Sequence, residues 1–426
     1  MEEKASSAEH LRLTEKKEGD IPPWRKWGPY VSERAWGTVR EDYSSDGNAW
    51  NYLSHDMAKE TAYRWGEDGI AGLCDRYQVL ALTFAFWNGV DPILKERLFG
   101  LTPTEGNHGE DVKEHYYYLD NTPTHSYMRY LYKYPHAPFP YDELRAENGR
   151  RGTSEREYEL VDTGIFDEGR YFDIDIEYAK VDPEDIAIRL TISNRGPDAA
   201  RIDVVPQLLF RNTWSWHDGA PKPAITAQNG ALVADDAAAP ELERINFSYR
   251  LGRRYLYGDG RGKPLFTDNE TGPKGAFHHH IVDGAPCSAM SGTKGGLHFS
   301  SIEIEGSASH EILLRLSPRE IENPLADVVS CIETRRGEAD AFYESIHPKG
   351  ASSDDKRIQR QALAGMLWSK QIYLYDVNQW LKGDAMHPNP APERATIRNH
   401  HWRHLISKRV MSMPDAWEYP WFAAWD

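Results

Sequence analysis

The sequence has few cysteines and no long apolar run. Cys74, Cys287 and Cys331 are the three cysteines among 426 residues. Their odd number and wide spacing predict neither a disulfide framework nor a zinc site. No stretch approaches the roughly 20 apolar residues that a membrane-spanning helix needs. The first residues are charged and do not resemble a secretory signal. These features predict a cytoplasmic protein that has no membrane segment.

Positive charge is also scarce. The chain has 50 lysines and arginines against 66 acidic residues, which gives a net charge of −16. Because nucleic-acid-binding proteins usually carry a basic stripe, and none is visible, we expect no nucleic-acid partner. Phosphate-binding glycine loops and the motifs of serine or cysteine nucleophiles are missing too. Trp and Tyr are plentiful, at 14 and 23, which suits a cleft for a ligand with apolar faces and hydroxyl groups.

Alternating apolar and polar residues predict a β domain. We expect a solvated tail over residues 1–22 and a β-sandwich over residues 23–345, with a long loop at 100–145. The strand at 171–178 ("YFDIDIEY") alternates apolar and acidic residues, which predicts one buried and one wet face. Further strands are predicted at 76–87, 186–193 and 201–210, with a hairpin over 297–316.

The apolar spacing becomes helical after Pro348. Ser352 and Asp355 fit a capping box, and Gly383 fits a helix C-terminus, so we expect one long helix from about 354 to 382. Residues 350–426 are therefore predicted to contain this helix and the beginning of an α domain.

Two histidine clusters are weak metal candidates. His278 to His280 read as part of a strand, in which only His278 and His280 share a face. His400 and His404 have the i, i+4 spacing of zinc proteases, but His401 stands where the catalytic Glu is required. A strand with outward polar residues is the favoured interpretation of the first cluster, and packing or hydrogen bonding is the favoured role of the second. We expect no metal and no other cofactor.

The segment at 102–128 is long and rich in aromatic and acidic residues. Long loops of this kind are often lids or binding segments. An ordinary contact between domains explains the segment equally well, so both interpretations stay open. Its chemically notable residues are Glu105, His108, Glu110, Asp111, Tyr116, Tyr117 and Tyr118.

The final stretch, "PDAWEYPWFAAWD", places carboxylates among aromatic rings. Aromatic faces can stack against a pyranose ring, and a partly desolvated carboxyl keeps its proton near neutral pH. A general acid that protonates a glycosidic oxygen needs that property. The alternative is a core helix with a capping acid. The acids are Glu418 and Asp426, and the aromatic residues are Trp417, Tyr419, Trp421, Phe422 and Trp425.

Four segments resemble bacterial relatives of glycoside hydrolase family 63. They are "ERAWGTVREDYSSDGNAWNYLSHDMAKETAYRWGEDGIAG", "LFGLTPTEGNHGEDVKEHYYYLDNTPTHSYMRYLYKYPHAPFPY", "RNTWSW" and "MPDAWEYPWFAAWD". The last is the most specific. That family includes glucosidases of mannosyl-oligosaccharides and hydrolases of mannosylglycerate. The resemblance implies an antiparallel β-super-sandwich, a linker helix and the beginning of an (α/α)6 barrel that carries the active site.

The resemblance also implies inverting hydrolysis of an α-glucosidic or α-mannosidic bond. Trp425 and Asp426 match the family's general-acid motif, and Trp417, Glu418 and Tyr419 are expected to line the sugar site with the other aromatic residues of the run. The general base of the family lies further downstream, so we expect this chain to be a truncated form that is inactive alone. A non-catalytic carbohydrate-binding sandwich and a glycoside phosphorylase are the alternatives.

Overall fold

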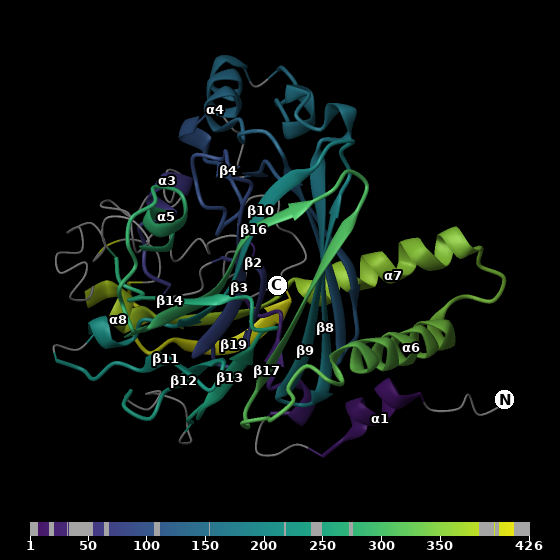
Figure 1. Cartoon of the computed structure of the whole chain (residues 1–426). Coiled ribbons are helices and arrows are strands. Elements are labelled where there is room, and N and C mark those ends of the chain that lie inside the picture. Colours follow the sequence, from purple (N-terminus) through teal and green to yellow (C-terminus); the bar gives the residue numbers. More distant parts are fainter. Residues whose placement is uncertain are drawn as a thin grey trace.

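The computed structural model describes twelve stretches of the chain, and they form two large antiparallel sheets with helices against their outer faces (Figure 1). The apolar residues of both sheets make one continuous core cluster, so the sheets pack face to face as a β-sandwich. The described residues are 7–16, 21–31, 33, 54–63, 68–105, 111–152, 154–216, 219–239, 249–271, 276–382, 396 and 400–412.

The six-stranded sheet is buried on both faces at its centre. Leu82 and Phe84 face the core between the sheets, whereas Ala81 and Ala85 lie on the outer face beneath other elements. In spatial order, its strands are β1 (Trp27–Gly28), β2 (Ile70–Asp75), β3 (Leu80–Trp87), β10 (Ala200–Phe210), β16 (Lys294–Ile304) and β14 (Lys263–Thr267).

The nine-stranded sheet contains the predicted strands with alternating patterns. Ile174 and Ile176 face the core, as the alternation predicts. In spatial order, the strands are β15 (Ser291–Gly292), β11 (Ala224–Gln228), β12 (Ala231–Asp235), β13 (Arg254–Tyr257), β17 (Ser309–Ser317), β9 (Asp185–Asn194), β8 (Tyr171–Asp182), β7 (Tyr127–Pro135) and β6 (His115–Asn121).

The prediction of a hairpin over 297–316 is wrong. Both strands exist, but β16 pairs with β10 in one sheet and β17 pairs with β9 in the other. The alternation of apolar and polar residues identifies a strand but not the sheet to which it belongs. The strand with which it pairs depends on contacts with residues that are distant in sequence. The chain therefore crosses between the sheets here, and the crossing loop is held by the bond from the Ser307 amide to the Gly196 carbonyl, 3.1 Å.

A helix covers the face of β8 that the sequence predicts to be wet. The apolar side of α6 (Val328–Ile346) packs Val328 and Ile332 against the outer face of the nine-stranded sheet. Glu177 is 4% exposed there and pairs with Arg189 at 2.7 Å and with Arg336 of α6 at 2.5 Å. The acidic residues on this face are therefore partners for cations rather than groups exposed to water.

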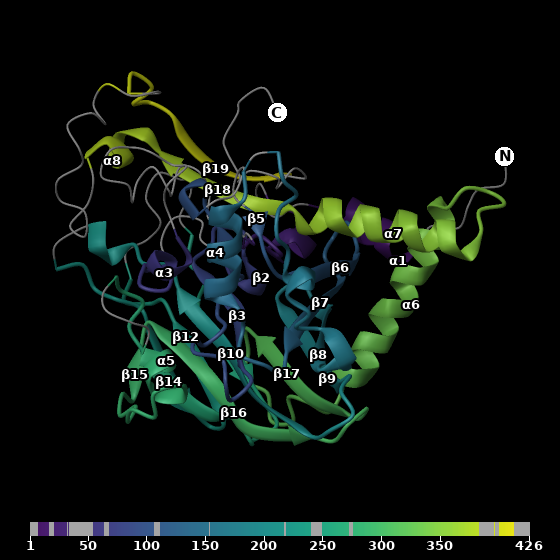
Figure 2. The ribbon, with the colours of Figure 1, turned by 90° about the horizontal axis from the view of Figure 1, so that it is seen from above.

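The long helix predicted from 354 to 382 is interrupted. The capping box of Ser352 and Asp355 is confirmed at the start of α7 (Ser353–Trp368), but the chain then forms β18 (Lys370–Asp376) and α8 (Val377–Lys382). The segment "IYLY" favours a strand once a partner is available, and β19 (Ile406–Ser412) supplies it. Figure 2 shows α7 running along β6 and leading to this hairpin.

Part of the predicted solvated tail is a packed helix. In α1 (Ala8–Thr14), Glu9 is fully buried. Its carboxylate accepts hydrogen bonds from the Thr124 amide at 2.7 Å and from the Ser126 hydroxyl at 2.8 Å, and Arg12 forms an ion pair with Glu338 of α6. A buried carboxylate with several donors fixes the helix against the sandwich, which a charged sequence does not reveal.

The triple histidine lies on a helix, not on a strand. In α5 (Ala276–Ile281), Phe277 and Ile281 are buried against the six-stranded sheet, and the His279 Nδ1 atom lies 2.6 Å from the Asp283 carboxylate. The remaining elements are η1 (Pro23–Arg25), α3 (His55–Ala58), β4 (Gly100–Leu101), η2 (Pro103–Glu105), β5 (Asp111–Val112), α4 (Tyr141–Arg150), η3 (Leu160–Thr163), η4 (Asp167–Gly169) and η5 (Trp214–Trp216).

The helices α1, α5, α6 and α7 pack against the sandwich, whereas α4 packs in a separate apolar cluster with Phe99 and Leu160 (Figure 1). No helix in the described part of the chain combines the length and the apolar composition that crossing a lipid bilayer requires. The beginning of an (α/α)6 barrel, expected within residues 350–426, stays a prediction.

Candidate functional site

The predicted catalytic and sugar-binding residues lie outside the described residues. They all fall within 413–426, and the described chain stops at Ser412, where β19 ends. The hairpin of β18 and β19 lies on the outer face of the six-stranded sheet, where Ile372 of β18 packs beside Tyr30 and Leu209. The residues concerned are Trp417, Glu418, Tyr419, Trp421, Phe422, Trp425 and Asp426. Their roles stay predictions.

Part of the segment at 102–128 belongs to the nine-stranded sheet. Residues 115–121 form β6, and the chain turns back into β7 at Tyr127. Tyr118 stacks on Trp368 of α7 with ring centroids 5.2 Å apart, and Tyr116 lies against Tyr130 at 6.0 Å. These two tyrosines pack against the core. Glu105 accepts a bond from Arg145 at 3.1 Å, whereas His108 and Glu110 fall outside the described residues.

The histidines at 400–404 do not form a helix. Residues 400, 401, 403 and 404 lie in turns that precede β19, so the i, i+4 spacing does not place His400 and His404 on one helix face. Among the described residues, no three His, Cys, Asp or Glu side chains gather as a metal ion would require.

The turn between β2 and β3 is held by a buried carboxylate. Asp75 accepts hydrogen bonds from the Tyr77 amide at 3.0 Å, the Leu80 amide at 2.9 Å and the Tyr249 hydroxyl at 3.1 Å. Burial raises the pKa of Asp75, and these three donors oppose that rise. The turn also places Gln78 in the left-handed region, with φ of 58°. It is thus a rigid support that presents Arg76 and Gln78 to two different pockets.

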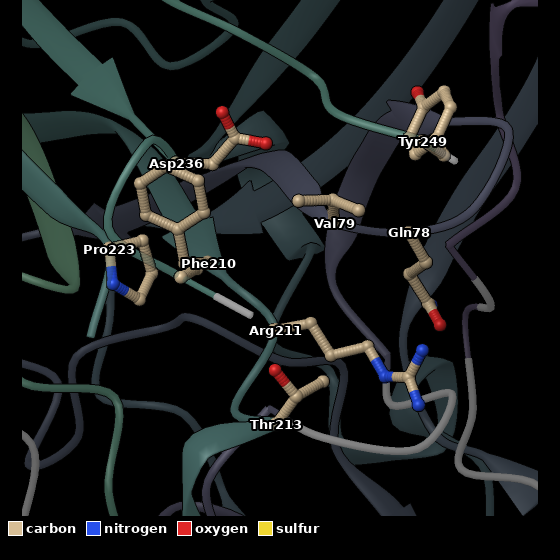
Figure 3. Close-up of a pocket in the computed structure, with 9 residues that line it drawn as sticks. Gln78, Val79, Phe210, Arg211, Thr213, Pro223, Asp236 and Tyr249 are labelled. Carbon is tan, nitrogen blue, oxygen red and sulfur yellow. The ribbon is translucent and has the colours of Figure 1, made fainter. Parts of the chain in front are cut away.

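One of these pockets, here called the Gln78 pocket, is shown in Figure 3. The Gln78 amide is fully buried, and neither its nitrogen nor its oxygen has a hydrogen-bond partner within the described chain. The Asp236 carboxylate is engaged by the Leu251 and Gly252 amides, at 2.8 and 2.9 Å. The pocket is lined by Gln78, Val79, Phe210, Arg211, Thr213, Pro223, Asp236, Ala239 and Tyr249.

The second pocket, here called the Arg76 pocket, lies between the sandwich and the β18–β19 hairpin. The Ile372 amide of β18 bonds to the Tyr30 carbonyl at 3.1 Å, and the Arg76 amide bonds to the Lys26 carbonyl at 2.7 Å. These backbone bonds fix the hairpin and the turn on either side of a cavity of about 290 Å³. It is lined by Pro22, Arg25, Tyr30, Arg76, His125, Lys370, Val410, Met411 and Ser412.

The charged groups that the described residues contribute to the Arg76 pocket are all cationic. Burial lowers the pKa of Lys370, and the positive charge of Arg25 lowers it further. Burial likewise holds the pKa of His125 well below its usual range, and the charges of Lys180, Lys370 and Arg25 add to this effect. His125 is therefore neutral at pH 7, and the site has fixed positive charge from the arginines and Lys370.

Sequence reasoning missed the Arg76 pocket. Its basic residues come from η1, from the β2–β3 turn and from β18, with His125 from the β6–β7 turn. Neighbouring members of this set are 49 to 245 positions apart in the sequence, and Arg25 and Lys370 are 345 positions apart. No local spacing signals such a site, because only the packing of the hairpin against the sheet brings these residues together.

One curated protein is clearly similar in sequence. The chain is 38% identical over 483 aligned positions to the uncharacterized protein YMR196W of Saccharomyces cerevisiae. The match covers 99% of the chain and 43% of the yeast protein, so the chain spans less than half of that relative's length. No family model matches the chain. This likeness establishes a relative without assigning an activity to either protein.

Two solved structures show weaker likeness. A candidate kojibiose phosphorylase from the human microbiome is 8% identical, with 78% of this chain and 40% of that chain covered and a TM-score of 0.25. A galactose mutarotase related enzyme of Lactobacillus acidophilus is 6% identical, with 61% and 93% covered and a TM-score of 0.21. At these TM-scores neither likeness establishes a shared fold.

Proposed function

We propose that this chain is part of a carbohydrate-active enzyme, an inverting glycoside hydrolase that cleaves α-glucosidic or α-mannosidic bonds. The observation that carries the proposal is the run Trp417–Asp426, in which a carboxylate follows a dense set of aromatic residues. In this assignment Asp426 is the general acid, and the rings stack on the sugar. The cytoplasm is the proposed compartment, and a carbohydrate is the proposed partner.

The described fold supports this proposal through its architecture. Two large antiparallel sheets form a sandwich, and α6 and α7 follow it in the chain. The family resemblance implies this order ahead of a catalytic barrel. More than half of the yeast relative lies outside the match, which is enough length for a barrel and a general base.

The proposed reaction needs two carboxyl groups with opposite roles. Asp426 donates its proton to the glycosidic oxygen as the bond to the anomeric carbon breaks. A base on the other side of the sugar removes a proton from water, which attacks the same carbon and inverts its configuration. Inverting enzymes hold these carboxyl groups about 6.5–9.5 Å apart. We assign the base to the sequence beyond Asp426, so the 426-residue chain is expected to be inactive alone.

The test uses a longer protein in which this chain is followed by the proposed barrel. Asp426→Asn is expected to lower the turnover of an alkyl α-glucoside by at least about 100-fold, while calorimetry still detects sugar binding. A dinitrophenyl glucoside should be much less affected, because its leaving group needs no proton. Asp415→Asn is the matched control, since Asp415 lies in the same stretch but before the aromatic run, and it should leave turnover within about twofold.

The same experiment separates the alternatives. Unchanged turnover in Asp426→Asn would remove the acid assignment. Sugar binding without turnover in the wild-type longer protein would favour the non-catalytic carbohydrate-binding sandwich. Release of a sugar 1-phosphate only when phosphate is present would favour a glycoside phosphorylase.

A further inference from the structure

Three cations from three separate elements line the Arg76 pocket. Arg25 belongs to η1, Arg76 to the β2–β3 turn and Lys370 to β18. The Arg25 Nε atom donates to the Pro123 carbonyl at 3.3 Å, a bond that leaves its charge uncompensated. The described lining contains no carboxylate, and Ser412 adds a hydroxyl group. The cavity therefore presents several hydrogen-bond donors and concentrated positive charge.

Several buried cations elsewhere in the described sandwich lie against carboxylates. Lys95 and Glu114 are 2.6 Å apart, Arg315 and Asp185 are 2.7 Å apart, and both pairs are almost fully buried. This pairing is the usual way to offset the cost of desolvating a charge. The cations of the Arg76 pocket depart from it, although the whole chain carries a net charge of −16. Their mutual repulsion costs stability unless an anion enters the pocket.

Two lining atoms add an independent observation that points to a ligand. His125 is 1% exposed, and its Nδ1 atom lies 3.0 Å from the Asn121 side-chain oxygen, to which it donates. Its Nε2 atom is then the acceptor of the neutral ring and has no partner within the described chain, so it suits the hydroxyl of a protonated phosphate oxygen. The Arg76 Nη1 atom is also buried without one. Because buried polar atoms in folded proteins are nearly always hydrogen-bonded, each exception calls for an explanation.

We propose that the Arg76 pocket binds a small, multiply charged oxyanion, with inorganic phosphate as its simplest form. Guanidinium groups match phosphate oxygens in geometry, and an ammonium group adds a point charge. A phosphoryl group can come as free phosphate or as part of a phosphorylated sugar, and both present the same oxygens. The cavity, of about 290 Å³, has room for such a group. Its cationic lining excludes a metal cation.

The experiment compares phosphate binding by the wild-type chain with binding by charge-removing variants. Calorimetry and thermal melts are run at constant ionic strength, so that screening stays equal across samples. Phosphate should bind the wild-type chain and raise its melting temperature. Arg76→Gln and Lys370→Gln should each raise the dissociation constant at least about tenfold. Lys370→Arg keeps the charge and should retain binding. Lys263→Gln, an exposed lysine of β14, is the matched control.

A second readout guards against a variant that simply folds poorly. Removing one of several repelling cations should make Lys370→Gln melt about 1–2 °C higher than the wild type without phosphate. The same variant should lose the phosphate-dependent rise. Phosphate also stabilises proteins in general. The specific effect is therefore the difference between the phosphate-dependent rise in melting temperature of Lys263→Gln and that of Lys370→Gln.

Two outcomes would overturn the proposal. One is a wild-type chain that shows no phosphate binding at millimolar concentration. The other is equal binding by the wild type, Arg76→Gln and Lys370→Gln, which would place any phosphate elsewhere. Glucose 6-phosphate and glucose serve as further arms, and tighter binding of the sugar phosphate than of phosphate identifies a phosphorylated sugar as the source. The proposal does not depend on glycosidase activity, because it is tested by binding to the 426-residue chain.

Discussion

At the scale of single residues, Lys180 shows how the fold changes the chemistry of a side chain. Its ammonium group donates to the carbonyls of Trp24 and Trp27 and to that of Thr124 at 3.2 Å. It therefore ties the segment that carries Arg25 to the turn that carries His125. Burial lowers the pKa of Lys180 to about 7, and the carboxylate of Glu9 only partly opposes this shift.

This pKa predicts the direction in which stability changes with pH. An unfolded lysine titrates near pH 10.4, so between pH 7 and 9 the unfolded chain holds a proton that the folded chain has lost. Stability should therefore rise with pH in this window, by up to about 1.4 kcal/mol per pH unit from this group. Thermal melts of the wild type and of Lys180→Met, measured from pH 7 to 9, isolate that contribution.

Lys180→Met should be less stable at every pH, by about 2 kcal/mol or more, because it leaves buried carbonyls without donors. The informative quantity is the slope. The variant should lack the part of the rise that belongs to Lys180, whereas Lys263→Met, at an exposed position, should keep it. Identical slopes in the wild type and Lys180→Met would show that Lys180 does not titrate in this range.

At the scale of elements, α7 closes one edge of the nine-stranded sheet. Trp368 is 3% exposed, stacks on Tyr118 and donates from Nε1 to the Asp120 carbonyl at 2.9 Å. Arg360 lies about two helical turns before Trp368 and forms an ion pair with Asp120 at 2.5 Å. Edge strands with free backbone groups are prone to pairing with other chains. The helix therefore both packs the core and covers β6.

Removal of the Trp368 ring should loosen this edge. Trp368→Ala is expected to lower the free energy of unfolding by about 3–5 kcal/mol, because a large buried ring is lost and a cavity is left. Chemical denaturation measures this change, and hydrogen exchange should show faster exchange in β6 than in β8. Met366→Ala is the control on the same helix, since Met366 is 46% exposed, and its effect should stay below about 1 kcal/mol. Unchanged exchange in β6 would contradict the covering role.

The positions of the strands were easier to predict from the sequence than the strands with which they pair, and the reason is physical. The alternation in 171–178 and 186–193 reports burial on one face, and both segments are strands that pair with each other. The segment 370–376 has helical spacing in sequence, yet it forms a strand because β19 pairs with it and Ile372 is buried. Local patterns carry information on burial, whereas pairing depends on residues far along the chain.

At the scale of the whole molecule, two candidate sites differ in how visible they are from sequence. The run that ends at Asp426 is local, so its residue types and spacing can be recognised directly. The Arg76 pocket combines Arg25, His125 and Lys370 with Arg76, and it exists only after the hairpin has packed on the sheet. Packing between residues that are distant in sequence creates the Arg76 pocket, so residue spacing in the sequence does not predict it.

The same long-range packing places a limit on where the sandwich can be divided. Sequence patterns predict that the sandwich ends at residue 345, but the core cluster also contains Ala364 and Trp368. A chain that ends at 345 lacks α7, so Tyr118 and the edge of β6 lose their cover. A chain that ends at 369 keeps the whole of α7 and with it the full core cluster.

We therefore expect the shorter chain to melt at least about 5 °C below the chain that ends at 369, because it loses the burial of a large ring. It should also aggregate more readily through β6. Thermal melts followed by circular dichroism, with light scattering on the same samples, compare the two chains. Equal melting temperatures would mean that α7 is an addition to a complete sandwich. A lower melting temperature for the shorter chain would show that α7 is a structural part of the sandwich, and the boundary of the β domain would then lie after Trp368.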